Sequence, residues 1–314
     1  MVAGGGGPAL GYLFGLLGTL TLVKSASTLQ AEQYLAPFAR GEKICAFALS
    51  EPDAGTNSFN IKTTAVAEGG GFRINGNKWF ITNIDNSDAL LLVAKTAPSG
   101  KEAVKSGSLS LFLIDLPNES LDYTPIPKHG FNYYKSNQLF IEDLFVPESA
   151  LVGTLGKGFA SLAPTLNAER LLVAAGSIGL ARLALSSAVL YASERVVFDV
   201  PIGAHQAVQH PLAAAHARLE SAWWTVRQAA AMEDQGDQSA HATALANTAK
   251  YVAVEAAIDA CYHSLQAYGG AGYAREYHQE RWWREVQLFR LAPLTQQMTL
   301  NFIGQHVLGL PRSY

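Results

Sequence analysis

The sequence predicts an α+β fold, in which an antiparallel β-barrel-like middle domain is followed by a four-helix up-down bundle. Between about residues 44 and 152 the chain consists of short runs rich in β-branched and aromatic residues, separated by turn-forming residues. From about residue 158 onward, apolar residues recur three and four positions apart, which is the period of a helix. Strand-like runs without helical patterns between them favour a barrel or sandwich, and long helices with short connections favour a bundle.

The individual elements follow from these patterns. Strands are expected at residues 47–50, 72–74, 79–82, 89–93, 109–114 and 137–141. Ala-rich helices are expected at residues 158–194, 204–235, 239–268 and 277–307. The expected domains are a remnant of an N-terminal helical domain at 1–40, a β-domain at 41–152 and a C-terminal helical bundle at 153–314.

Composition excludes several classes of protein. A length of 314 residues suggests about two domains, and 49% hydrophobic with 16% charged residues is typical of a folded globular protein. A net charge of −3 without a basic stripe argues against nucleic acid as a partner. The two cysteines, Cys45 and Cys261, are too far apart for a disulfide framework or a zinc site. We expect no metal site and a reducing compartment, cytoplasmic or similar to the mitochondrial matrix.

The apolar run from Pro8 to Val23 needs separate treatment. No Lys or Arg precedes Lys24, so the basic start of a signal peptide is missing. The run is also short and interrupted by glycines, which argues against a membrane span. We therefore expect a buried helix of a packed domain.

A set of ordered motifs extends this interpretation. They are Cys45-Ala-Phe-Ala-Leu-Ser-Glu-Pro-Asp-Ala-Gly-Thr-Asn, Gly76-Asn-Lys-Trp-Phe-Ile-Thr-Asn, Phe145-Val-Pro with Leu151-Val-Gly, Arg195-Val-Val-Phe with His205-Gln206, and Gln266-Ala-Tyr-Gly-Gly-Ala-Gly-Tyr. In this order and at this spacing they resemble the acyl-CoA dehydrogenase family over essentially the whole chain. Most of the family's front helical domain has no counterpart in the sequence.

The resemblance implies FAD as the cofactor. Phe47, Leu49 and Ser50 match a strand that faces the isoalloxazine ring. Phe80 and Thr82 match residues that cover its other side, with the Thr hydroxyl near the reactive nitrogen. Taken alone, a Phe-Ile-Thr run would fit any half-buried strand.

Further matches concern the substrate and a neighbouring subunit. Thr56 matches a residue that contacts the thioester ligand, and Arg170 matches one beside the CoA end of the pocket. The positions that serve a neighbour's FAD are Arg195, Phe198, Gln206, Gln266 and Gly270, and a further cofactor-contacting pair is Thr295 and Gln297. Val197 and Asp199 depart from the family's Thr and Gly. The acid at 199 would repel a diphosphate unless it points away.

The family's reaction needs a carboxylate base for the α-proton and hydrogen bonds to the thioester oxygen. At the position of the family's common base on a late loop, this chain has Pro293. Glu169, directly before Arg170, resembles the base of a branch that includes isovaleryl-CoA dehydrogenases, although a Glu-Arg pair also occurs on exposed helix surfaces. Because proline has no N–H, one donor to the thioester oxygen is lost, unless Leu294 donates or the flavin's ribityl hydroxyl acts alone.

The resemblance therefore implies an FAD-dependent acyl-CoA dehydrogenase of fatty acid metabolism, with an acyl-CoA substrate and Glu169 as the base. Its expected partners are an acceptor such as an electron-transfer flavoprotein and further subunits, in a homo-dimer, a tetramer or a hetero-oligomer. One alternative is a catalytically weak or non-catalytic subunit that pairs with a complete homologue, which Pro293 and the shortened front favour. A flavoprotein oxidase on the same fold is a third hypothesis.

Overall fold

The computed structural model describes residues 11–96 and 109–312, which divide into two compact units. The sheet unit comprises Gly11–Lys128 and Asn132–Leu166. The helical unit comprises the described residues from Asn167 onward together with His129–Phe131. The domain limits expected from the sequence, at 40/41 and 152/153, stay a prediction.

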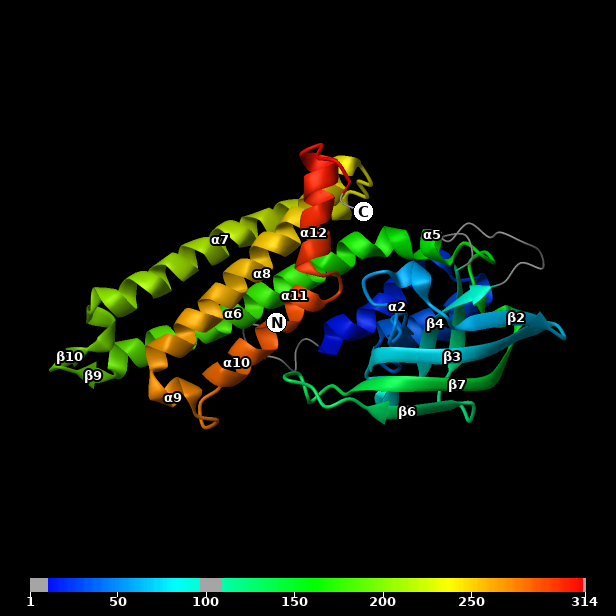
Figure 1. Ribbon diagram of the computed structural model, residues 1–314, viewed down its shortest axis with the longest axis horizontal. Coiled ribbons are helices and arrows are strands. Elements are labelled where there is room, and N and C mark those ends of the chain that lie inside the picture. Colours follow the sequence, from blue (N-terminus) through cyan, green and yellow to red (C-terminus); the bar gives the residue numbers. More distant parts are fainter. Residues whose placement is uncertain (1–10, 97–108, 313–314) are drawn as a thin grey trace. The chain divides into compact units, whose positions relative to one another are not determined.

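Eight strands of the described chain form one sheet in the order β6-β7-β3-β2-β4-β5-β8, with β1 paired to β4 (Figure 1). They are β1 (Cys45–Ala48), β2 (Thr64–Glu68), β3 (Gly71–Thr82), β4 (Ala89–Thr96), β5 (Leu109–Asp115), β6 (Leu121–Pro125), β7 (Ser136–Pro147) and β8 (Leu151–Val152). The α+β class is confirmed. The sheet differs from the expected antiparallel barrel in two respects, because β4 pairs in parallel with β1 and β2, and because β6 and β8 are not paired with each other.

Two departures within the sheet have simple causes. The strands expected at 72–74 and 79–82 are parts of one long strand, β3, since Asn75 and Gly76 remain paired with neighbouring strands. Strands β2 and β6 were not expected because most of their side chains are exposed, so they lack the apolar runs of a core strand.

The strand β4 explains where the core of the sheet unit lies. Leu90, Leu92 and Ala94 are buried in a cluster on one face of the sheet. Leu91 and Val93 are buried in a second cluster on the other face. A strand that is covered on both sides has the continuous apolar sequence seen here.

Helices from the start of the chain belong to this unit. They are α2 (Gly11–Ser25), α3 (Thr28–Gln30) and α4 (Ala36–Ala39), and a further helix, α5 (Gly158–Leu162), follows the sheet. Leu22 of α2 is 1% exposed and joins the core cluster that contains Leu91. The described part of the run expected to form a buried helix is thus helical, while residues 8–10 lie outside the described residues.

Three helices of 29 residues each dominate the helical unit: α6 (Leu166–Glu194), α7 (Gln206–Asp234) and α8 (Ala240–Tyr268) (Figure 1). A short hairpin of β9 (Val196–Val197) and β10 (Val200–Pro201) joins α6 to α7. In the described residues, the stretch 158–194 is the one helical segment long and apolar enough to cross a membrane, and half of its most apolar window is buried. Such burial is typical of a core helix.

The fourth expected helix, at 277–307, is broken. After the single turn α9 (Gly270–Tyr273) come α10 (Gln279–Val286), α11 (Leu288–Leu291) and α12 (Gln296–Phe302). Ala292 is extended, with φ −121° and ψ 152°, because the ring of Pro293 disfavours a helical conformation in the preceding residue. The break produces an irregular loop at residues 292–295.

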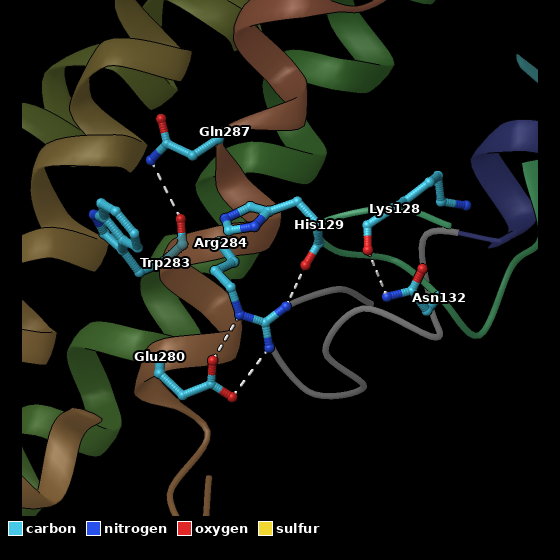
Figure 2. A network of polar contacts seen from close by, with 7 residues as sticks. All are labelled: Lys128, His129, Asn132, Glu280, Trp283, Arg284 and Gln287. Atoms are coloured by element: carbon cyan, nitrogen blue, oxygen red, sulfur yellow. Dashed lines mark hydrogen bonds and ion pairs between the residues drawn. The ribbon is translucent and has the colours of Figure 1, made fainter. Parts of the chain in front are cut away.

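Arg284 of α10 organises one corner of the helical unit (Figure 2). Its guanidinium donates to both carboxylate oxygens of Glu280, at 2.6 and 3.1 Å, and to the backbone carbonyl of His129. Phe131, 2% exposed, packs edge-on against Phe289 with ring centroids 5.8 Å apart. The segment His129–Phe131 is therefore held by α10 and α11.

Gly76 on β3 provides a test of this packing. A Cβ atom at this position would lie 2.3 Å from Thr63 Oγ1 and 2.7 Å from Thr63 Cα. Gly76→Ala should therefore lower the free energy of unfolding by about 1–3 kcal/mol, as overpacked core sites do. Gly55→Ala is the control, because a Cβ there meets nothing within 4 Å. Equal urea midpoints for the two variants would contradict the packing described for β3.

Candidate functional site

The first two signature motifs meet in the sheet unit. The backbone N–H of Trp79 donates to Ser50 O at 2.8 Å, and Lys78 Nζ donates to Leu49 O at 3.0 Å. Phe47 and Leu49 are half-buried against the core. The structure thus brings together the strand ends that the sequence assigned to the two sides of a flavin.

A buried ion pair fixes this junction. Lys78 Nζ lies 2.9 Å from Glu51 Oε1, and the two side chains are 0% and 4% exposed. Burial lowers the pKa of Lys78 to about 8, against the opposite effect of Glu51. Burial alone would raise the pKa of Glu51, but the Lys78 charge and hydrogen bonds from Thr63 and the Lys62 backbone bring it below its usual value. Both groups therefore carry their charges at neutral pH.

Phe80 is strained and exposed. Its φ is +60°, uncommon for a bulky residue, and it lies within the register irregularity between Lys78 and Ile81 in the pairing of β3 with β7. Its side chain is 56% exposed. Bulges re-aim side chains and occur often beside binding sites, and strained backbone clusters there as well. Two residues on, Thr82 is half-buried with Oγ1 3.2 Å from Ser136 Oγ.

The substrate-side candidate of the sheet unit lies in a turn. Glu51 and Ala54 pair through an isolated antiparallel bridge that closes the turn after β1. Thr56 follows this turn and is exposed. Its hydroxyl can contact a ligand from this position, and its role stays a prediction.

Arg195, Phe198 and Gln206 lie at the hairpin that joins α6 to α7, and all three are exposed. Phe198, 86% exposed, and Asp199 form the turn of this hairpin with φ of +55° and +64°. A two-residue hairpin requires such positive φ angles, and Asp tolerates them better than most residues. The departure from the family's Gly at 199 therefore leaves the hairpin intact.

Gln266 and Gly270 lie where α8 ends, which is the same end of the helical unit as the hairpin (Figure 1). Gly269 ends α8 with φ 58° and ψ −136°, a combination that is essentially restricted to glycine. A Cβ on Gly272 would lie 2.5 Å from Leu265 O. The glycines of this motif thus serve a tight reversal of the chain.

Glu169 and Arg170 lie at the opposite end of α6, in its first turn. Glu169 is half-buried, and burial raises the pKa of its carboxyl to about 7, although the charge of Arg170 acts in the other direction. Arg170 donates to Asn167 Oδ1 at 2.9 Å, while its Nε is buried with no hydrogen-bond partner in the described structure. Burial lowers the pKa of this guanidinium. A half-buried Glu and an incompletely paired Arg therefore stand side by side.

The late loop at 292–295 is attached to α8. Lys250, 0% exposed, donates to Leu294 O at 2.8 Å and to Gln296 Oε1 at 2.9 Å. Gln296 in turn donates to Glu255 Oε1 at 2.9 Å, and Glu255 also pairs with Arg290 of α11. Burial lowers the pKa of Lys250 to about 8, against the opposite effect of Glu255 and with a smaller contribution from Arg170 in the same direction. The loop is thus fixed on both sides of Pro293.

The last two predicted cofactor residues follow this loop. The Thr295 side chain accepts a hydrogen bond from Met298 N at 3.3 Å and so caps α12. Gln297 is exposed in the first turn of that helix. Their expected contact with a cofactor stays a prediction.

Comparisons with known proteins agree with these motifs. A family model described as "Acyl-CoA dehydrogenase, middle domain" matches residues 46–144, and "Acyl-CoA dehydrogenase, C-terminal domain" matches residues 156–308. Acyl-CoA dehydrogenase FadE12 of Mycobacterium tuberculosis is 40% identical over 287 residues, which are 91% of this chain and 72% of the relative. The chain belongs to the acyl-CoA dehydrogenase family.

Solved structures confirm the fold of this acyl-CoA dehydrogenase family member. Butyryl-CoA dehydrogenase from Megasphaera elsdenii is 30% identical with a TM-score of 0.87, covering 93% of this chain and 75% of that chain. The FAD complex of PigA is 27% identical with a TM-score of 0.89, covering 97% and 79%. The resemblance inferred from the motifs is confirmed, and with it the assignment to a family of FAD-dependent oxidoreductases.

The residues of the sheet unit fit a flavin. An isoalloxazine ring needs an apolar wall and hydroxyl or backbone donors at its polar edge. Phe47 and Leu49 leave part of their apolar surface open, and Phe80 exposes a ring that no described residue covers fully. Thr82, two residues after Phe80, supplies a hydroxyl that is half-buried against Ser136. The flavin-side residues of this acyl-CoA dehydrogenase family member are therefore chemically suitable for binding an isoalloxazine ring.

Sequence reasoning missed the two buried lysines of this acyl-CoA dehydrogenase. Lys78 lies within the second motif, four residues after the buried Ile74, so its side chain takes an inward position of β3. A lysine at an inward position of a strand requires a buried partner. Its place in the strand pattern could therefore have predicted a buried ion pair. For Lys250, the partners Leu294 and Gln296 are more than 40 residues away, so no local pattern indicated them.

Lys78→Met tests the importance of the buried pair. Removing the ammonium leaves the Glu51 carboxylate buried without a counter-charge, so the free energy of unfolding should fall by about 3–5 kcal/mol. Lys62→Met is the matched control, since its pair with Asp53 has side chains 71% and 67% exposed, and its stability should be nearly unchanged. Denaturant titration of both variants measures the free energy of unfolding. A similar small decrease for each would show that the buried pair contributes little to stability.

Proposed function

We propose that this chain is an acyl-CoA dehydrogenase in which Glu169 removes the α-proton of an acyl-CoA thioester. The supporting observation is the position of Glu169, half-buried in the first turn of α6 directly before Arg170, where burial raises the pKa of its carboxyl to about 7. A general base works best when its pKa lies near the operating pH. At neutral pH a substantial fraction of Glu169 is deprotonated, and Arg170 favours that anion.

The late loop supports this assignment by elimination. By the resemblance to the family's late-loop motif, Pro293 takes the position of the common base, and a proline can neither accept the proton nor donate an N–H. The carbonyl of Leu294 is already bound by Lys250. We propose that the Leu294 N–H, for which the described residues provide no acceptor, takes the place of the missing donor to the thioester oxygen.

The flavin, when bound, supplies the acceptor for the β-hydride. We propose that Phe47, Leu49, Ser50, Phe80 and Thr82 hold its ring. The acyl-CoA would contact Thr56 and Arg170. Electrons would pass on to an electron-transfer flavoprotein, in a reducing compartment where the buried thiols of Cys45 and Cys261 stay free.

The length of α6 supports an oligomer. Glu169 and Arg195 are separated by 26 residues at opposite ends of this helix, which corresponds to about 39 Å. An extended dinucleotide does not bridge that distance. We therefore propose that Arg195, Phe198, Gln206, Gln266 and Gly270 contact the FAD of a second subunit in a homo-dimer or tetramer.

Glu169→Gln tests the base. The amide has nearly the same volume, so FAD binding should stay intact, whereas anaerobic bleaching of the flavin by acyl-CoA should slow about 10²–10⁴-fold. In the wild type the bleaching rate should rise with pH through about 7, because the active form is the carboxylate and its pKa is raised to that value. Stopped-flow reduction with straight and branched acyl-CoAs from butyryl- to palmitoyl-CoA measures both effects.

Glu194→Gln, at the exposed far end of α6, is the control and should bleach like the wild type. A Glu169→Gln variant that bleaches at the wild-type rate would exclude Glu169 as the base. If the wild type holds FAD but no acyl-CoA bleaches it, the chain is a non-catalytic subunit.

Arg195→Ala tests the shared cofactor site. Loss of a charge-assisted hydrogen bond to a diphosphate should weaken FAD retention about 10- to 100-fold and loosen the assembly at the same time. Asp199→Gly should have the opposite effect on retention, because it removes a negative charge from a turn with φ +64°. Light scattering and the flavin-to-protein ratio are measured together. A monomer that retains FAD tightly would contradict the proposal.

A further inference from the structure

A chain of three polar side chains ends at Thr82. Thr82 and Ser136 are paired across β3 and β7, and their hydroxyl oxygens lie 3.2 Å apart. Lys128, in the loop before β7, donates from Nζ to Ser136 Oγ at 3.1 Å and also to the carbonyl of Tyr134. None of these contacts is required by the proposed base or by the ion pair at Glu51.

The backbone around this chain is held firmly. Ile126 N donates to Ser136 O, and Asn83 N donates to Lys135 O, both at 2.8 Å. These bonds hold the start of β7 against the residue that follows β3 and against the residue that follows β6. Ser136 is 6% exposed, so its side chain has little room to move away from Thr82.

The chemistry of the groups gives the chain a direction. An ammonium has donors only, so Ser136 Oγ must accept from Lys128. In the described residues, the second group within hydrogen-bond reach of Ser136 Oγ is Thr82 Oγ1. A buried hydroxyl proton without an acceptor costs free energy, so Ser136 donates to Thr82. Thr82 Oγ1 then accepts, and its own proton, for which the described residues provide no acceptor, remains available as a donor.

The charge at the start of the chain is also set by its surroundings. Lys128 is half-buried, and burial lowers the pKa of its ammonium, against the effect of Asp85. Asp85 is itself paired with Lys135 at 2.9 Å. A poorly solvated ammonium donates strong hydrogen bonds, which strengthens the polarisation of Ser136.

We propose that Lys128 acts through Ser136 as a positioning residue, setting the Thr82 hydroxyl as a hydrogen-bond donor toward the flavin. The inference rests on the proposed function, in which Thr82 contacts the flavin ring. The reactive nitrogen of oxidised flavin is a hydrogen-bond acceptor, so a hydroxyl preset as a donor favours binding of the oxidised form.

The test measures the dissociation constant of oxidised FAD for the flavin-depleted protein by flavin fluorescence. Ser136→Ala removes the link while leaving both neighbours, and should weaken FAD binding about 2- to 10-fold, the range for one hydrogen bond. Ser136→Thr keeps the hydroxyl and should bind like the wild type. Thermal unfolding of each flavin-free variant confirms that it is folded.

A double-mutant cycle separates the relay from other effects. In a Thr82→Ala background, Ser136→Ala should cause no further loss, because the relay acts only through the Thr82 hydroxyl. Lys128→Met should behave in the same way. A further loss of FAD affinity in that background would overturn the relay. Ser136→Ala alone binding FAD as tightly as the wild type would overturn it as well. A wild-type protein that binds no FAD would overturn the proposed function as well, so the two failures are distinguishable.

Discussion

Lys78 and Glu51 form an ion pair in the interior of the sheet unit, where water cannot solvate either charge. A buried charge is tolerated only when it is paired and its remaining hydrogen bonds are made. Glu51 meets this condition by accepting from Lys78 and from the backbone at Lys62 and Thr63. The turn after β1 therefore cannot shift without β3. The flavin-side residues of the sheet unit lie on β1, on the turn that follows it or on β3, so their relative placement depends on this pair.

The helical unit also buries a lysine, but its direct partners are neutral oxygens and not a carboxylate. Lys250 is buried on α8 and binds the carbonyl of Leu294, so the loop around Pro293 is attached to a rigid helix. Glu169 differs from Glu51, since among the described residues its one charged influence is Arg170 and burial dominates. A carboxyl in this condition exchanges its proton near neutral pH, whereas Glu51 stays ionised. Burial raises the pKa of both glutamates, but the partners of Glu51 outweigh it and bring that pKa below its usual value, whereas Arg170 does not outweigh it at Glu169.

Particular elements show how far the pattern of residues carried the prediction of the fold. The apolar run of β4 and the helical period of α6, α7 and α8 identified these elements, because each buries a face that must be apolar. Strands β2 and β6 have mostly exposed side chains and so left no such pattern. The stretch 277–307 kept a helical period across Pro293, although the backbone breaks there. The parallel pairing of β1 with β4 has no local signature at all.

The sequence by itself determined the fold class, the family, the absence of an acid at position 293 and the candidate base at Glu169, because motifs and periodicity are properties of neighbouring residues. Only the tertiary structure decided which lysines are buried, that Ser136 lies between Lys128 and Thr82, and that the pKa of Glu169 is raised to about 7. Desolvation and hydrogen-bond direction depend on groups from distant segments, which meet only when the chain folds.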